Sequence, residues 1–151
     1  MKQSELYKIR KLCSTYYSFD TWAHALRVEK YVRDDARYAL LSPDEQLIVS
    51  AVALLHDIRE DTKCTEWQIA KCIQNPLDVI VVIRTLRIVS RKIGEKYFTY
   101  IRRLISSRSL YAIMVKQADM KDHLSESATL TASLEKRYRK AAKILLTSDN
   151  I

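Results

Sequence analysis

The chain has 151 residues, enough for one domain with a single core, and 48% of them are hydrophobic, which excludes an intrinsically disordered protein. One Gly and two Pro leave too few turn residues for a β-sandwich or β-barrel, so the sequence predicts an all-α fold. The formal net charge of +8 is compatible with an anionic partner. Because Lys and Arg are scattered among acidic residues, however, a slightly basic surface explains this charge equally well.

Hydrophobic periodicity predicts about eight helices. Ser42 and Thr65 are typical N-cap residues, and Gly94 marks a break between two helices. The β-branched run at 79–89 resembles a strand, but its length and its Asn75-Pro76 start favour a helix. The expected ranges are about 3–16, 22–40, 43–60, 66–73, 76–89, 95–107, 110–124 and 127–146.

Cysteine content and hydropathy indicate the compartment. Cys13, Cys64 and Cys72 are odd in number and lack Cys-x-x-Cys spacing, so we expect free thiols rather than a disulfide framework or a zinc ribbon. No apolar stretch approaches the ~20 residues of a membrane span, and the first residues lack the apolar core of a signal peptide. We therefore expect a cytoplasmic protein whose residues 1–151 form one domain.

The predicted 43–60 helix is apolar on nearly every side, yet the sequence places four polar groups at its end. His56, Asp57, Glu60 and Asp61 fall in one sector of a helix with 100° per residue. Ionised carboxylates beside a buried helix need metal ions, hydrogen-bond donors or cationic partners. Imidazole and carboxylate ligands together suit Mn²⁺, Fe²⁺ or Zn²⁺.

Two other predicted helices contain residues of the same type. Asp119 lies within about 60° of Lys116 and His123 on one helix face, and His24 lies in the 22–40 helix. Each also has a structural explanation, since His24 fits a hydrogen-bonded core histidine and Asp119 fits a surface pair with Lys116. Residue type and spacing alone leave a metal site and a plain structural role both open.

The order His24, His56-Asp57 and Asp119 on successive helices resembles the HD-domain metal phosphohydrolases. Four segments make the resemblance narrower, pointing to the hydrolase domain of the Rel/SpoT family and to the small alarmone hydrolases. "AVALLHDIREDT" is similar to the HDxxED segment of that family, "HALRV" to "HPLRV", "VSRKIGEKYFTYIRRL" to "LTRREGESYEDYIERV", and "VKQADMKDHL" to "VKLADLxDNL". The resemblance covers about residues 21–140.

This resemblance implies an HD-type helical bundle that hydrolyses guanosine 3′,5′-bis(diphosphate)-type alarmones and releases pyrophosphate. It implies one divalent metal ion, Mn²⁺ first and Fe²⁺ or Zn²⁺ as alternatives. The implied metal ligands are His24, His56, Asp57 and Asp119. In the family, an acidic pair positions and activates the attacking water, and Glu60 and Asp61 match this pair. The implied substrate-binding residues are Lys116, His123, Ser90 and Tyr138.

The differences from the family lie on the nucleotide side of the implied pocket. His123 replaces an Asn, Ser90 replaces a Thr, and "YYSFDTWAH" lacks the Gly and Pro of "KxGxPYIxH". Two alternatives therefore stay open: an HD phosphohydrolase for another nucleotide, and a degenerate nucleotide- or nucleic-acid-binding module. We expect a nucleotide substrate, with neither a membrane nor a nucleic acid as partner. The sequence leaves open a homo-oligomer and a toxin–antitoxin context, in which small relatives act as antitoxins.

Overall fold

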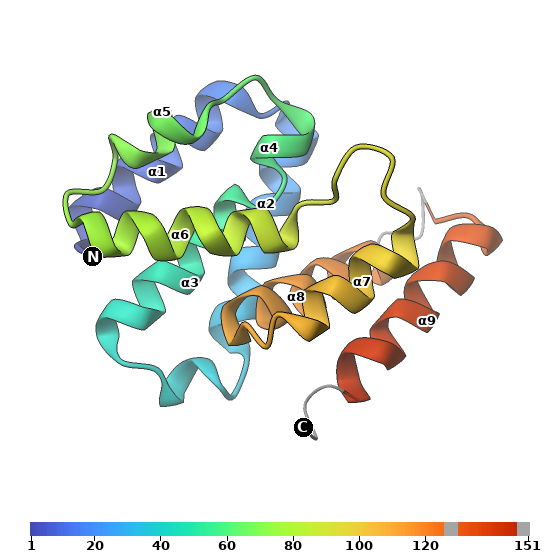
Figure 1. Ribbon diagram of the computed structural model, residues 1–151. Coiled ribbons are helices and arrows are strands. Elements are labelled where there is room, and N and C mark those ends of the chain that lie inside the picture. The colour runs from blue at the N-terminus through green and yellow to red at the C-terminus, as the bar shows by residue number, and fades with distance from the viewer. Residues whose placement is uncertain (126–129, 148–151) are drawn as a thin grey trace.

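The computed structural model describes residues 1–125 and 130–147. Within these ranges it contains nine α-helices, one 3₁₀-helix and no strand (Figure 1), which confirms the predicted all-α fold. In chain order the elements are α1 (Gln3–Tyr16), α2 (Phe19–Asp34), η1 (Tyr38–Leu40), α3 (Pro43–Leu55), α4 (Ile58–Asp61), α5 (Glu66–Ala70), α6 (Pro76–Val89), α7 (Tyr97–Ser106), α8 (Leu110–Ser125) and α9 (Ala132–Thr147).

Side-chain caps begin three of the predicted helices where the sequence places them. The Ser42 hydroxyl accepts the backbone N–H of Glu45 at 3.3 Å, and the Glu45 carboxylate accepts the N–H of Ser42 at 2.8 Å, which is a capping box. Thr65 caps α5 in the same way. Asn75 caps α6, so the β-branched run is a helix as predicted.

Two of the predicted helices are shorter than their hydrophobic patterns suggest. The predicted 43–60 helix ends at Leu55, and a separate turn, α4, follows it, which raises the helix number from eight to nine among the described residues. The predicted 22–40 helix ends at Asp34 because the Asp35 carboxylate accepts the backbone N–H of Arg37 at 2.8 Å, a local bond that competes with the helix.

The remaining boundary differences lie at helix starts and ends. The α2 helix begins before Trp22, since Ser18 caps it by accepting the N–H of Thr21 at 3.2 Å. The α5 helix ends at Ala70, with tighter i→i+3 turns covering the predicted 71–73 end. Gly94, with φ at +76°, lies in a turn of the segment that connects α6 to α7. Helix α7 begins two residues later than expected. The predicted start of the last helix at 127 lies outside the described residues.

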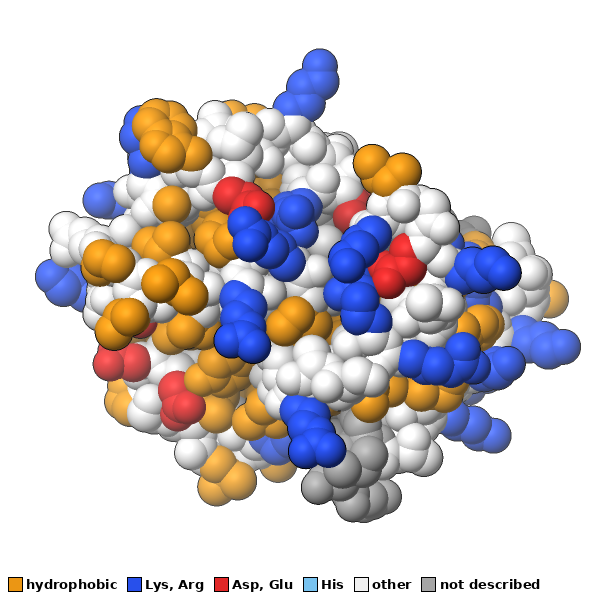
Figure 2. Space-filling model, viewed as in Figure 1, with side chains coloured by type: hydrophobic (Ala, Val, Ile, Leu, Met, Phe, Trp, Pro, Cys, Tyr) orange, Lys and Arg blue, Asp and Glu red, His pale blue; other side chains and the backbone are white. Residues whose placement is uncertain are grey.

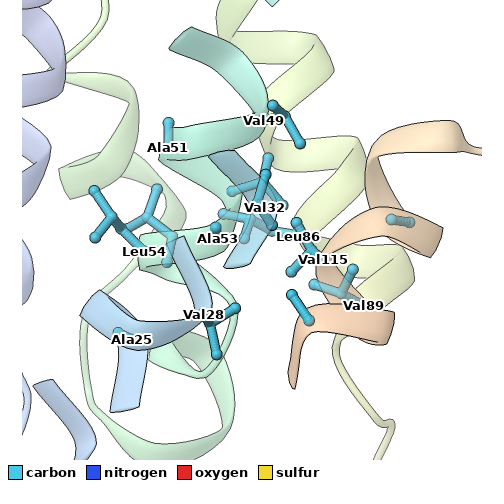
Figure 3. Packing of buried hydrophobic residues seen from close by; sticks show 14 of the residues in the cluster. Ala25, Val28, Val32, Val49, Ala51, Ala53, Leu54, Leu86, Val89 and Val115 are labelled. Carbon is cyan, nitrogen blue, oxygen red and sulfur yellow. The ribbon is translucent and has the colours of Figure 1, made fainter. Parts of the chain in front are cut away.

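Helix α3 forms the centre of the core. All residues from Ile48 to Leu55 are buried, and α3 packs against α1, α2, α6 and α8. Figure 3 shows valines of α2, α6 and α8 around Val49, Ala53 and Leu54 of this helix. The end of α3 is consequently held by the core on all sides, which fixes the position of the residues that follow it.

The surface agrees with the sequence composition. Figure 2 shows Lys and Arg side chains distributed over the face that α6, α7 and α9 form, rather than gathered in one patch. The three cysteines are free thiols. In the part of the chain that the structure describes, no helix combines the length and the apolar character needed to cross a membrane.

Truncating a buried leucine of α3 should test the central role of this helix. The Leu54 side chain is 0% exposed and that of Leu40 is 85% exposed. We expect Leu54→Ala to lower the free energy of unfolding by about 2–5 kcal/mol because it leaves a cavity. The control Leu40→Ala should change it by less than about 0.5 kcal/mol. Urea denaturation followed by circular dichroism measures both, and equal losses in the two variants would contradict this description of the core.

Candidate metal centre

The four expected metal ligands come from α2, the junction between α3 and α4, and α8, and their side chains meet at one point. The His24 Nε2 atom on α2 lies 3.2 Å from Nε2 of His56, 3.0 Å from Oδ1 of Asp119 and 3.6 Å from Oδ2 of Asp57. The His56 Nε2 atom lies 3.2 Å from the Asp57 carboxylate and 3.5 Å from that of Asp119. The structure thus brings together two imidazoles and two carboxylates from sequence positions up to 95 residues apart.

Hydrogen bonds at the other ring nitrogen, Nδ1, fix the tautomer that each imidazole adopts when it is neutral. The Nδ1–H group of His56 donates to the carbonyl oxygen of Ala53 at 2.7 Å. The Nδ1–H group of His24 donates to the carboxylate of Asp122 at 2.6 Å. In the neutral imidazoles each Nε2 then presents a lone pair. Two such lone pairs 3.2 Å apart, next to carboxylate oxygens, are stable only with a proton or a metal ion between them, and nitrogen and oxygen donors of this kind fit a divalent metal ion.

Asp122 and Arg27 hold His24 in place, and the sequence did not point to either of them. Arg27 donates from Nε and Nη2 to the two carboxylate oxygens of Asp122, at 2.8 and 3.0 Å. Asp122 follows Asp119 by three positions and Arg27 follows His24 by three positions, so each pair lies on one helix face. That spacing on the two helices was the available signal. A carboxylate behind a metal-binding histidine orients its ring.

Asp119 is buried and electrostatically compensated. Burial alone would raise its pKa, but the ammonium of Lys116 and the neighbouring imidazoles hold the pKa of Asp119 well below its usual range. Lys116 Nζ donates to Oδ2 at 2.7 Å. The acid in turn raises the pKa of Lys116 well above its usual range, against the effect of burial. The two groups therefore form a buried ion pair in which Oδ1 still faces the histidines.

His123 contacts the same carboxylate, in agreement with its expected place on the face of α8. Its Nε2 atom lies 3.0 Å from Oδ1 of Asp119, and its ring centroid lies 4.9 Å from that of His24. The Tyr138 ring on α9 stacks on His123 with centroids 4.9 Å apart and an interplanar angle of 18°. His24, Asp119 and His123 form a second set of donors close enough to hold an ion. The geometry allows His123 either role, that of a ligand or that of a substrate contact.

The two acidic residues of α4 differ in position. Glu60 lines the same pocket as His56, Asp57 and Asp119, and its carboxylate accepts the backbone N–H of Arg91. Burial, followed by the charge of Asp57, raises the pKa of Glu60 despite that hydrogen bond. Asp61 is exposed, does not line the pocket, and makes no side-chain hydrogen bond to a described residue, while partial burial raises its pKa. Glu60 is the better placed of the two for chemistry.

Three of the four expected metal ligands, His56, Asp57 and Asp119, line the first of two adjoining pockets. The first has a volume of about 150 Å³ and contains Lys116, His123 and Tyr138, three of the four expected substrate contacts, in its lining. The second has a volume of about 780 Å³ and shares Glu60 and Arg91 with the first. Ser90, the fourth, lines only the second pocket, and its hydroxyl donates to the carbonyl oxygen of Leu86 at 2.7 Å.

Comparison with known proteins adds a likeness to solved structures. No protein-family model and no curated protein matches the chain. Among solved structures, the fold is similar to that of a metazoan ortholog of SpoT that hydrolyses ppGpp. The TM-score is 0.68 and the sequence identity is 18%, over 98% of this chain and 86% of the other. At this identity the likeness establishes the fold alone.

Removing the carboxylate behind His24 should weaken metal binding without unfolding the protein. We expect Asp122→Ala to lower Mn²⁺ affinity by roughly ten- to a hundredfold, because the ring of His24 loses its orienting acceptor. Asp34→Ala is the control, since Asp34 lies on the exposed surface and pairs with Lys30 at 2.8 Å. Calorimetric titration with Mn²⁺ measures both, and an unchanged affinity in Asp122→Ala would show that Asp122 does not support the centre.

Proposed function

We propose that this protein is a cytoplasmic, metal-dependent hydrolase that releases pyrophosphate from guanosine 3′,5′-bis(diphosphate)-type alarmones. The observation that carries the proposal is the pair of Nε2 atoms of His24 and His56, 3.2 Å apart, facing the carboxylates of Asp57 and Asp119. The similarity of the fold to a SpoT ortholog described as hydrolysing ppGpp supports the choice of substrate. So does the resemblance of four sequence segments to the alarmone hydrolases.

His24, His56, Asp57 and Asp119 would hold the metal ion, with Mn²⁺ as the first candidate and Fe²⁺ or Zn²⁺ as alternatives. When bound, such an ion supplies a Lewis acid that lowers the pKa of a water molecule and polarises a phosphoryl oxygen. The hydrogen bonds of Asp122 and Ala53 keep both Nε2 atoms free for this task.

Glu60 is proposed as the general base for the attacking water. The Arg91 backbone N–H orients its carboxylate toward the pocket, and its raised pKa makes it a better proton acceptor than an exposed glutamate. Asp61, the next residue, adds negative charge that favours the protonated product of this step. Lys116, which lines the same pocket, is proposed to donate to a phosphate oxygen.

The pocket sizes support a division between the phosphate groups and the nucleoside. The first pocket, at about 150 Å³, is smaller than the roughly 300–1,000 Å³ of sites that bury a whole drug-sized ligand. It suits phosphate groups near the metal ligands. The adjoining 780 Å³ pocket, which Ser90 lines, is proposed for the nucleoside. The stacked rings of His123 and Tyr138 line the first pocket and are proposed as substrate contacts there.

A second candidate function is the hydrolysis of another nucleotide. The observation that favours it is His123, whose imidazole reaches within 3.0 Å of Asp119 where the resembling family has an Asn. A different donor at this position changes which base or sugar the pocket accepts.

A nucleotide panel with the purified, Mn²⁺-loaded protein separates these functions. We expect pyrophosphate release from guanosine tetraphosphate and guanosine pentaphosphate. Phosphate release from nucleoside monophosphates, with no pyrophosphate from the alarmones, would instead support the second candidate. No release from any nucleotide would overturn both and favour a binding module.

Alanine substitution at the end of α3 should remove the metal. We expect His56→Ala and Asp57→Ala each to abolish stoichiometric Mn²⁺ binding, since each deletes a donor from a set of four. The helical circular dichroism spectrum should be retained, because neither side chain belongs to the apolar core. Metal analysis of the purified variants is the measurement. A variant that retains one Mn²⁺ per chain would remove that residue from the ligand set.

The role of Glu60 can be tested by an isosteric change. Glu60→Gln should retain Mn²⁺ and substrate binding while kcat falls by about 10²–10⁴-fold, the usual contribution of a general base. Glu66→Gln is the control, because Glu66 pairs with Arg87 on the surface at 3.0 Å. Steady-state kinetics on the same alarmone compare the two, and a near-normal kcat for Glu60→Gln would assign the proton transfer to another group.

A further inference from the structure

Three cationic side chains surround the ring of Tyr97 in the first pocket. The Arg137 Cζ atom on α9 lies 3.7 Å from the centroid of that ring, that of Arg91 lies 5.8 Å from it, and Lys116 Nζ lies 5.9 Å from it. All three residues line the pocket that contains Asp57 and Asp119. Cations held this close together repel one another unless anions compensate them.

The three cations differ in their partners. Lys116 is paired with Asp119 at 2.7 Å, and Arg91 donates from Nε to the carbonyl oxygen of Glu95 at 2.7 Å. The Nε atom of Arg137 is buried and has no hydrogen-bond partner, and no carboxylate of the described residues pairs with its guanidinium. A buried donor without an acceptor costs free energy, so Arg137 is the cation at this pocket that most requires an anion.

The charge at the pocket indicates what kind of anion fits. A divalent ion at the metal ligands offsets Asp57 and Asp119, which leaves Glu60 as the lining carboxylate against Lys116, Arg91 and Arg137. This balance favours an anion with several charges rather than one. A guanidinium presents donors in a fork that matches the oxygens of a phosphate group.

We propose that Arg137 binds the second phosphate of a pyrophosphate group whose first phosphate lies at the metal ligands. The inference deepens the proposed function and rests on it, since it assigns α9 the recognition of the leaving group. Arg137 is then a specificity-determining residue, by which the pocket distinguishes a pyrophosphate group from a single phosphate.

Binding of inorganic pyrophosphate and orthophosphate to the Mn²⁺-loaded protein tests the proposal without any turnover. We expect Arg137→Gln to weaken pyrophosphate binding by about ten- to a hundredfold, the effect of losing a hydrogen bond to a charged group. Orthophosphate binding should stay unchanged. Arg137→Lys should recover only part of the affinity, because an ammonium lacks the fork geometry. Calorimetric titration measures both anions, and circular dichroism and metal analysis establish that each variant is folded and loaded.

Lys136→Gln is the matched control, since Lys136 is the exposed neighbour on α9 and its substitution removes the same charge. It should leave both affinities unchanged. Unaltered pyrophosphate binding in Arg137→Gln, an equal loss for both anions, or no pyrophosphate binding by the unsubstituted protein would overturn the proposal. If the unsubstituted protein hydrolyses no alarmone, yet Arg137→Gln selectively loses pyrophosphate, the proposed function fails and the assignment of Arg137 stands.

Discussion

A single buried carboxylate, that of Asp119, connects the elements around the candidate site. Its Oδ1 atom lies 3.0 Å from His24, 3.5 Å from His56 and 3.0 Å from His123, while Oδ2 accepts from Lys116 at 2.7 Å. These contacts join α2, the end of α3 and α8 at one carboxylate group. Without Asp119, the imidazoles and Lys116 would lose their common anion, and burying them would cost far more free energy.

The apolar core determines where this charged cluster lies. Helix α3 is buried from Ile48 to Leu55, and the chain bends directly after it, so His56 and Asp57 emerge at the boundary between core and pocket. Electrostatic interactions are stronger at such a boundary than in water, because the effective dielectric constant is lower. The same burial that makes the acids costly therefore also makes them effective toward a cation.

Local signals in the sequence predicted the helices and their caps well, since a cap such as Ser42 depends on residues within one turn. The bend after Leu55 was missed because hydrophobic periodicity continues through α4 and does not report backbone direction. The end of α2 was missed because the bond between Asp35 and Arg37 competes with a helix that the pattern favours. Asp122 was missed because its three-residue spacing from Asp119 does not by itself show that α8 packs against α2, on which its function depends. Convergence of the other site residues was anticipated only through the family resemblance.

The distance along the chain between the donors links the site to folding. His24 and Asp119 are 95 positions apart, so their side chains meet only after α8 has packed against α2. An unfolded or partly folded chain offers His56 and Asp57 as neighbours but not the complete set. Any cation that prefers the complete set consequently shifts the equilibrium toward the native chain by mass action. For a chain that binds such a cation, the thermal midpoint of unfolding depends on the free metal concentration, and chelation lowers it even in the absence of substrate.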